Sequence, residues 1–489
     1  MKAAQTEVSY RRAECYHGQS IMSQELSDYY KIPENLLAEF AVPSLSGDAG
    51  FFQFGSKATC YGQSASGVSR HVENSCSYDA VRSTHIIGPS IRLSFDPTRV
   101  IENLRREVYV DSLTPDRERI LTQEWILKAY YGIRGALPVA IRQYVQRAYF
   151  SDWSQRPFPA WPVDVSVDRV HEQLLSLSMK ATGVKRIPFI WFWPAASPNC
   201  LILTHDVETA AGRDFTPQLI DLDESYGFKA SFQVIPEKRY KVPDHYVQAI
   251  RSRGCEFNIH DLNHDGHLYW EREEFLRRAK LINEYGRRYH ARGFRSGSMY
   301  RRIDWYDAYE FSYDMSLCNV AHLEPKRGGC CTVMPFFIGQ IVELPLTTSQ
   351  DYSVFHILNH RSIDLWKEQV NLIRAKNGLM SFLTHPDYVI SRRARNVYES
   401  LLDHLRQIVM RDKTWVALPG ELDEWWRARK RMKLVNKSGG WVIEGYGRER
   451  ASIAYAVLDG DWLVYEVLGT QHTRRLNEEP QLYTSGKLV

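Results

Sequence analysis

The sequence predicts an α/β protein in which helices cover a parallel sheet or barrel. Three observations lead to this class. Between residues 200 and 430, short apolar runs alternate with longer amphipathic stretches, as in strands connected by helices. Several of these apolar runs end abruptly in histidine and acidic residues. From residue 433 the pattern changes to the strict alternation of a small antiparallel β unit.

The part of the chain before this unit divides into two predicted regions. Residues 1–97 are expected to form a mixed α+β region, with short strands at 51–55, 58–62 and 91–95. Residues 98–195 are expected to form a helical connector, because Asp96 and Pro97 are typical of a helix start. Its helices are predicted at 98–107, 116–131, 137–150 and 168–182, with a stiff proline-rich link at 156–164.

The predicted helix at 137–150 carries Arg142 and Arg147 on its polar side. A basic amphipathic helix can lie on a membrane surface. A helix with one solvated face has the same pattern. The sequence therefore leaves both a weak membrane-surface contact and an ordinary surface helix open.

Residues 196–431 form the predicted barrel, and residues 432–489 the small antiparallel β unit. Barrel strands are expected at 201–204, 230–235, 256–260, 293–295, 379–384 and 415–417. Helices are expected between or after them at 216–226, 244–253, 271–291, 363–376, 397–411 and 420–430. In the tail, strands are expected at 440–444, 451–457 and 462–467, with a hairpin turn at 459–461.

Composition excludes several classes of protein. The 489 residues suffice for two or three domains, and 62 basic against 58 acidic residues argue against a nucleic-acid-binding protein. No apolar stretch is long enough to cross a bilayer, and no secretory signal is visible, so a cytoplasmic location is expected. The eight cysteines are scattered without a C-x-x-C pair, which predicts neither a zinc knuckle nor a disulfide framework.

Two strand ends carry the candidate chemistry. The run at 201–204 is followed by Asp206 and Glu208, and the strand at 256–260 ends at His260, with His264 four residues later. Carboxyl ends of parallel strands are where α/β proteins place their active sites, so the two ends should meet. Two imidazoles and a carboxylate with an open position for water are typical of a hydrolytic metal site. The neighbouring carboxylate would then be free to take a proton.

The stretch from about residue 201 to 417 resembles the polysaccharide deacetylase family, carbohydrate esterase family 4, through five motifs in the family's order. Three of them match closely: the Asp-x-Asp variant of the first motif at 204–208, His-x-x-x-His at 260–264 and Leu-x-His-Pro at 383–386. The third motif keeps Arg295 but lacks its proline. The fourth begins at Asp314 but has Cys318 in place of a tryptophan, and Glu208 is longer than the family's usual aspartate.

The resemblance implies a distorted (β/α) barrel and a role for each matching residue. Asp206 would be the general base, and Arg295 would pair with it. His385 would be the general acid, and Asp314 would hydrogen-bond to it. The metal ligands would be Glu208, His260 and His264. The metal would be a divalent ion, with zinc as first choice and cobalt, nickel or manganese as alternatives.

The activity that the resemblance implies is metal-dependent removal of an N-acetyl or other N-acyl group from an amino sugar. The substrate would be a nucleotide sugar, a lipid-linked sugar or a short glycan. The changed third and fourth motifs keep two alternatives open: a hydrolase of a non-sugar C–N bond, such as a cyclic imide or ureide, and a glycan-binding scaffold without catalysis. His205 is expected to be structural, whereas His267 and Glu343 could line the substrate site.

Overall fold

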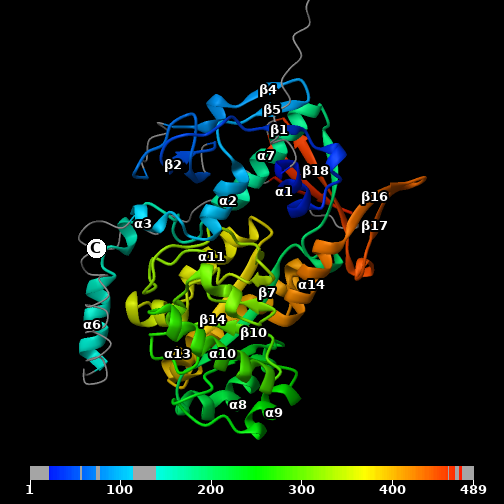
Figure 1. The fold of residues 1–489 in the computed structure, drawn as a ribbon. Helices are drawn as coiled ribbons and strands as arrows, with labels where there is room; N and C mark the ends of the chain where they lie inside the picture. The colour runs from blue at the N-terminus through cyan, green and yellow to red at the C-terminus, as the bar shows by residue number, and fades with distance from the viewer. Residues whose placement is uncertain are drawn as a thin grey trace, which may run out of the picture.

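The computed structural model describes residues 21–55, 58–72, 78–113, 139–460, 462–468 and 473–475. The helix predicted at 116–131 lies outside these residues. Figure 1 shows two parts: the green and yellow central segment forms the lower part, and the first and last segments, blue and red, come together above it. In the part of the chain that is described, no helix is long and apolar enough to cross a bilayer.

The lower part is built on one curled, nine-stranded sheet with the order β12-β13-β11-β10-β9-β8-β7-β14, and β15 also pairs with β7. All its neighbours are parallel except β12 and β13. The strands are β7 (Cys200–Val207), β8 (Ser231–Val234), β9 (Glu256–His260), β10 (Gly293–Arg295), β11 (Tyr313–Asp314), β12 (Phe336–Ile338), β13 (Ile341–Glu343), β14 (Leu379–Thr384) and β15 (Trp415–Val416). The predicted parallel α/β sheet is confirmed, including all six strands expected from the sequence.

Helices cover the outside of this sheet, and their apolar faces supply its outer core. They are α8 (Ala210–Ser225), α9 (Asp244–Ser252), α10 (Arg272–Arg288), α11 (Asp364–Arg374), α12 (Pro386–Val389), α13 (Arg392–Asp412) and α14 (Pro419–Arg431). In α13, for example, Val397, Leu401 and Leu405 recur every four residues and are buried. Helix α8 begins six residues before its predicted start, because the Thr209 side chain caps it by accepting from the amide of Gly212.

The seam of the curled sheet lies between β14 and the residues that follow β13. Here the chain runs beside β14 without a backbone ladder among the described residues, and two threonine hydroxyls bridge the gap. Thr347 Oγ1 donates to Leu379 O at 2.7 Å and accepts from Ser381 N at 2.9 Å. Thr348 Oγ1 donates to Ser381 O at 2.8 Å. The sheet therefore approaches a barrel and is closed by side chains.

The upper part combines both ends of the described chain. Its N-terminal elements are α1 (Ile21–Tyr30), β1 (Glu39–Ala41), β2 (Gly50–Gln53), β3 (Thr59–Gly62), β4 (His85–Ile87), β5 (Ser90–Arg92), α2 (Pro97–Arg105), α3 (Val110–Leu113) and α7 (Ser166–Thr182). Its C-terminal strands are β16 (Lys433–Lys437), β17 (Gly440–Glu444), β18 (Ile453–Asp459), β19 (Trp462–Val467) and β20 (Thr473–Arg475). Helix α6 (Val139–Tyr149) does not belong to this upper part and lies on the left of Figure 1.

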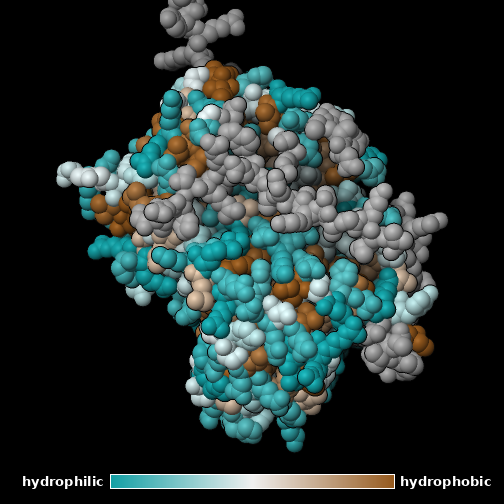
Figure 2. All heavy atoms as spheres, turned by 180° about the vertical axis from the view of Figure 1, so that it is seen from behind, coloured by the Kyte–Doolittle hydropathy of each residue, from teal (hydrophilic) through white to brown (hydrophobic). Residues whose placement is uncertain are grey.

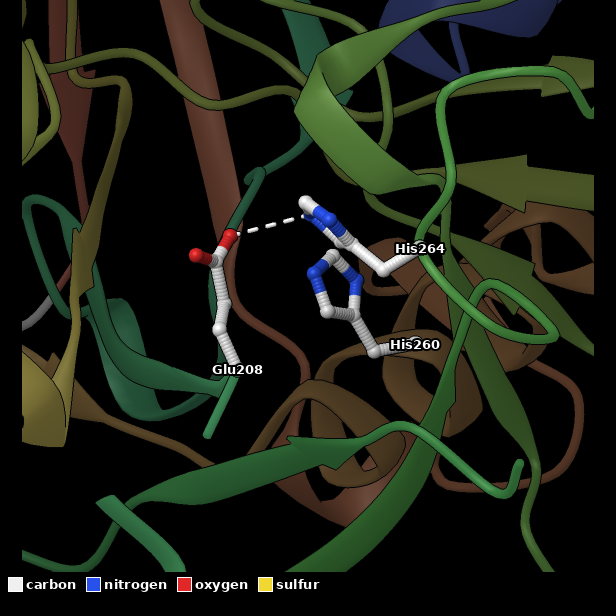
Figure 3. Close-up of side chains that lie close together, drawn as sticks. All are labelled: Glu208, His260 and His264. Atoms are coloured by element: carbon white, nitrogen blue, oxygen red, sulfur yellow. Dashed lines mark ion pairs between the residues drawn. The ribbon is translucent and has the colours of Figure 1, made fainter. Parts of the chain in front are cut away.

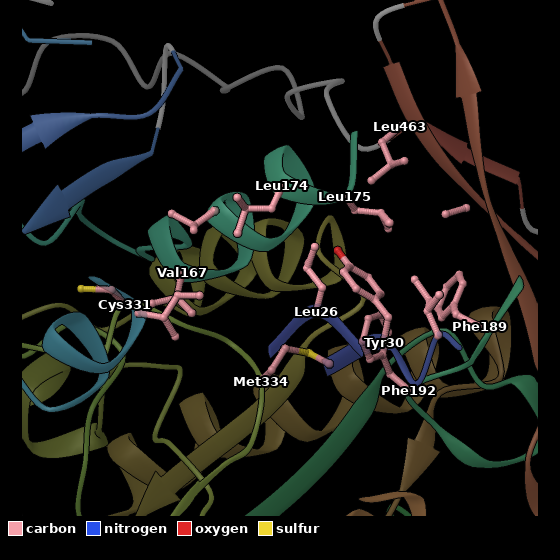
Figure 4. Packing of buried hydrophobic residues seen from close by; sticks show 14 of the residues in the cluster. Leu26, Tyr30, Val167, Leu174, Leu175, Phe189, Phe192, Cys331, Met334 and Leu463 are labelled. Atoms are coloured by element: carbon pink, nitrogen blue, oxygen red, sulfur yellow. The ribbon is translucent and has the colours of Figure 1, made fainter. Parts of the chain in front are cut away.

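One strand of the C-terminal sheet comes from the predicted helical connector. The segment β6 (Arg186–Ile190) pairs antiparallel with β18, although the sequence predicted no strand there. This pairing brings both ends of the described chain into one hydrophobic core, shown in Figure 4. The core includes Tyr30 of α1, Leu174 of α7, Phe189 of β6 and Leu463 of β19. The division into four regions stays a prediction, but the regions flanking the barrel are packed together.

A buried ion pair ties the N-terminal region to the barrel. Glu107 and Arg301 are both buried, with Arg301 Nε donating to Glu107 Oε2 at 2.8 Å and its Nη2 contacting Oε1. Nearby, the Tyr109 hydroxyl donates to Gly329 O at 2.6 Å. These contacts hold the long loops that follow β10 and β11, at the carboxyl ends of the strands.

Replacement of Glu107 by glutamine should lower the free energy of unfolding by about 3–5 kcal/mol, because it leaves a buried guanidinium without its counter-charge. Urea denaturation measures this change. The control is Asp304→Asn, since that carboxylate is 87% exposed and pairs with Arg106 on the surface, where an ion pair contributes little. Equal losses for the two variants would contradict a structural role for the buried pair.

Candidate active site

Three potential metal ligands converge at the carboxyl ends of β7 and β9, the two strands on either side of β8. Glu208 follows β7, His260 is the last residue of β9, and His264 lies in the loop after it. Figure 3 shows the three side chains pointing toward one another. Glu208 Oε1 lies 3.0 Å from His264 Nε2, and one ligand atom from each residue lies within 4.8 Å of the others. The sequence prediction that these strand ends meet is confirmed.

The polar atoms of these residues fit a bound cation. His260 Nε2 and His264 Nε2 are buried and, within the described residues, face carboxylate oxygens only: Asp206 Oδ2 lies 3.6 Å from the first, and Glu208 Oε1 lies 3.0 Å from the second. His260 Nδ1 lies 3.1 Å from Arg295 O, so the tautomer that donates there directs the lone pair of Nε2 into the cluster. A carbonyl that orients a histidine in this way is common behind metal ligands. Buried nitrogens without partners are costly unless something satisfies them.

Asp206 lies beside this cluster and is held by Arg295. Arg295 Nη1 donates to Asp206 Oδ1 at 2.8 Å, and both side chains are buried. The same Arg295 nitrogen also donates to Thr204 Oγ1 at 2.9 Å. Burial alone would raise the pKa of Asp206, but the charges of Arg295, His260 and His385 lower it on balance. Asp206 is therefore a carboxylate at neutral pH, able to accept a proton.

His385 faces the cluster from the end of β14. Its Nε2 lies 3.7 Å from Glu208 Oε1, and its Nδ1 lies 2.6 Å from Asp351 Oδ1. Asp351 Oδ2 accepts from the backbone amide of His385 at 2.8 Å, which fixes the residue from two sides. Burial would lower the pKa of His385, but Asp351, with Glu208 and Asp206, raises it to about 10. His385 is therefore held as an imidazolium, the form that can donate a proton.

The predicted hydrogen bond between Asp314 and His385 is wrong. Asp314, on β11, accepts from Ser316 N at 2.8 Å, from Ser316 Oγ at 2.9 Å and from the Tyr306 hydroxyl at 3.1 Å. It lies opposite Glu343 in the β11–β13 register, and burial raises the pKa of both carboxyl groups. Glu343 is fully buried, and its Oε1 accepts from the backbone amide of Leu317 at 3.0 Å; a contact with substrate stays a prediction. The partner of His385 is Asp351, a residue that the motifs did not indicate.

A signal for Asp351 was present in the sequence. The polar run 347–351 follows the mostly apolar segment 341–346, as the polar residues 204–206 follow the apolar first half of β7. His205 has the structural position expected of it: its side chain bonds Asp223 Oδ2 at 2.9 Å and Thr384 Oγ1 at 2.8 Å, in the buried layer under α8. Its neighbour Asp206 alternates to the opposite side of β7.

Cys318, where the family has a tryptophan, belongs to a small apolar cluster near the strand ends. The cluster consists of Met299, Cys318, Ala321, Leu346 and Leu383, all buried. Leu383 lies on β14, two residues before His385, so this cluster adjoins the end of that strand. The small side chain of Cys318 therefore fits this closely packed cluster, which would have to open to hold a tryptophan.

Gly297 is required because the loop that follows Arg295 closely approaches the loop that carries His264. A Cβ at this position would lie 2.9 Å from His264 Cδ2 and would contact Asp261 Oδ2 even more closely. Gly297→Ala should displace His264 and weaken metal binding by about 10–100-fold, the range seen when the support of a ligand is disturbed. Metal titration by calorimetry checks this. The control is Gly439→Ala, since a Cβ there meets nothing within 4 Å; equal affinities in both variants would contradict the steric argument.

Comparisons with known proteins find similar solved structures at low identity. Neither a family model nor a curated protein matches the chain. Among solved structures, one assigned as a polysaccharide deacetylase from Mycobacterium smegmatis is 16% identical and covers 49% of this chain and 93% of its own, with a TM-score of 0.39. A chitin deacetylase from Colletotrichum lindemuthianum is 14% identical and covers 47% and 89%, with a TM-score of 0.30.

A CE4-family pseudoenzyme from Bacillus anthracis also matches, at 14% identity over 47% of this chain and 66% of its own, with a TM-score of 0.31. These matches span about half of the chain. The assignment of individual residues therefore rests on their geometry in this structure. By the order of its motifs, the chain resembles the polysaccharide deacetylase family.

Proposed function

We propose that the protein is a metal-dependent hydrolase that removes an N-acetyl or other N-acyl group from an amino sugar. The observation that carries the proposal is that Glu208, His260 and His264, which could hold a metal ion, lie together with Asp206 and His385 at one end of the sheet. Amide hydrolysis needs an activated water, stabilisation of the oxyanion and a proton for the leaving nitrogen. The arrangement offers a group for each need.

Glu208, His260 and His264 would hold the divalent ion, with zinc as first choice and cobalt, nickel or manganese as alternatives. When bound, such an ion acidifies water and stabilises the negative charge on the carbonyl oxygen. Glutamate reaches one methylene further than the usual aspartate of the family's first motif. The backbone amide of Glu208 donates to Asp387 Oδ2 at 3.2 Å, and this hydrogen bond fixes the point from which the longer side chain extends.

The remaining residues would move and hold protons. Asp206 accepts the proton of the attacking water, and Arg295 keeps this carboxylate charged and oriented. His385 donates a proton to the amine nitrogen as the C–N bond breaks. Asp351 keeps His385 protonated until that step and fixes the direction of its ring. Asp314, one layer below, supports the loop after β11 through Ser316.

The resemblance supplies the substrate class: an N-acetylated nucleotide sugar, lipid-linked sugar or short glycan, as in the synthesis of a polysaccharide precursor. Purified full-length protein with Zn²⁺ or Co²⁺ should release acetate from at least one such sugar, and EDTA should stop the release. Cyclic imides and ureides belong in the same panel. Cleavage of those compounds alone would favour the non-sugar alternative, and turnover of nothing in the panel by metal-loaded protein would contradict a hydrolase.

A further inference from the structure

Helix α6 presents an apolar stripe to the outside of the molecule. Ile141, Tyr144 and Val145 are 48%, 74% and 41% exposed, and Ala148 is exposed as well. The positions i, i+3, i+4 and i+7 lie on one face of a helix. Figure 2, seen from behind, has α6 at its right-hand edge, where brown apolar atoms are exposed. A surface helix normally turns such a stripe toward the core, and this one turns it outward.

The other face of α6 is anchored, which fixes the direction of the stripe. Arg147 Nε donates to His356 O at 2.9 Å, and the Tyr352 hydroxyl donates to Gln146. At the end of the helix, Phe150 packs into a small cluster with Leu323 and Ile357. The helix is therefore held against the segment η7 (Ser353–Ile357) by its polar face, and the apolar stripe cannot rotate inward without breaking these contacts.

The surroundings of the stripe are positively charged. Helix α6 carries Arg142 and Arg147 and no acidic residue. Arg361 lies close to Arg147 and Arg393: burial first, and then these two charges, lower the pKa of Arg361. In the described part of the chain, neither Arg147 nor Arg361 forms an ion pair with an acidic side chain.

Helix α6 is also connected to the candidate active site. The ring of Tyr352, which holds α6, lies 5.7 Å from the ring of Tyr388, and His356 lies 4.9 Å from the same ring. Tyr388 in turn lies 5.1 Å from His385. The rings of Tyr352, His356 and Tyr388 thus lie between α6 and His385, the proposed general acid. A surface bound by α6 would lie on the His385 side of the site.

We propose that α6 docks on an anionic lipid surface, with Ile141, Tyr144 and Val145 entering the interface and the positive charge of the helix attracting the lipid headgroups. Apolar and aromatic residues on one face, combined with basic charge without acidic compensation, are the two features that bind a helix to such a surface. A protein partner would need no excess of positive charge, and the balanced net charge of +4 argues against nucleic acid. The proposal is independent of the reaction, because lipid binding is measured without substrate.

The test is co-sedimentation of the full chain with vesicles of phosphatidylglycerol and phosphatidylcholine in equal parts, and with vesicles of phosphatidylcholine alone. The wild-type protein should bind the anionic vesicles, and high salt should weaken the binding. Tyr144→Glu with Val145→Glu should reduce the affinity about tenfold or more, because it places two negative charges at an anionic surface. Circular dichroism and thermal unfolding establish that this variant folds.

A matched control is Met410→Glu with Tyr446→Glu, since these side chains are 72% and 88% exposed on other elements and add the same charge. The control should bind as the wild type does. Ile141→Ser with Tyr144→Ser, which leaves the charge unchanged, should also bind more weakly. The proposal would be overturned if the wild type did not bind the vesicles, or if all variants bound them equally. It would also be overturned if the wild type were a dimer that the stripe variants dissociate, because the stripe would then be an interface between two copies.

Discussion

Replacing His264 by alanine should abolish both metal binding and amide hydrolysis while the protein stays folded. The change removes one of three donor atoms that lie within 4.8 Å of one another, and a divalent ion is then left with two. Loss of oxyanion stabilisation alone costs about 10²–10³ in kcat, and loss of water activation adds to it. Elemental analysis of the purified variant and an acetate-release assay measure the two effects.

The control for this change is His267→Ala, three residues further along the same loop. The His267 ring lies against that of Trp270, with centroids 3.8 Å apart, and is partly exposed, so its loss removes an imidazole without removing a proposed ligand. This variant should keep one metal per chain and most of its activity. A His264→Ala protein that retained stoichiometric metal and wild-type turnover would show that the triad is not the metal site.

Replacing Asp351 by asparagine should lower kcat by about 10²–10⁴, the usual contribution of a positioned general acid. Asp351 is a positioning residue: it contacts His385 and not the substrate, and its charge keeps the imidazolium stable in a buried place. Without that charge, burial dominates and the pKa of His385 falls from its raised value of about 10.

The sign of the pH effect follows from this fall. The raised pKa keeps the proton-donating form of His385 present up to alkaline pH, so activity in the wild type should decline only there. In Asp351→Asn the protonated form of His385 is lost at a lower pH, so the alkaline limb of the pH–activity profile should shift to lower pH. His385→Asn should remove that limb altogether. An Asp351→Asn profile that coincides with the wild type would exclude this role for Asp351.

The fold of the barrel was predictable because its strands are short, buried apolar runs with clear ends. The bounds predicted for β9, β10 and β14 are those of the structure. Strand β6 was missed because it contains Pro188 and finds its partner in β18, more than 260 residues later in the sequence. No local pattern reports a pairing between segments so far apart, since it depends on the packing of α1 and α7 against the sheet that the two strands form.

The candidate site shows the same limit. His260 and His264, or Asp206 and Glu208, are close in the sequence, so spacing alone brings them together. Asp351 is 34 residues from His385, and the contact exists because the seam of the sheet places the end of β13 beside β14. The two-residue strand β11 gave no indication that the Asp314 side chain turns toward Ser316 and Tyr306.

Anomalous diffraction from crystals grown with Zn²⁺ or Co²⁺ tests the central claim most directly. At the absorption edge of the metal, the account predicts one strong peak per chain, in bonding distance of Glu208, His260 Nε2 and His264 Nε2, with Asp206 adjacent and not bound. A fully occupied peak elsewhere, or no peak at this triad in crystals whose side chains are arranged as described, would contradict it.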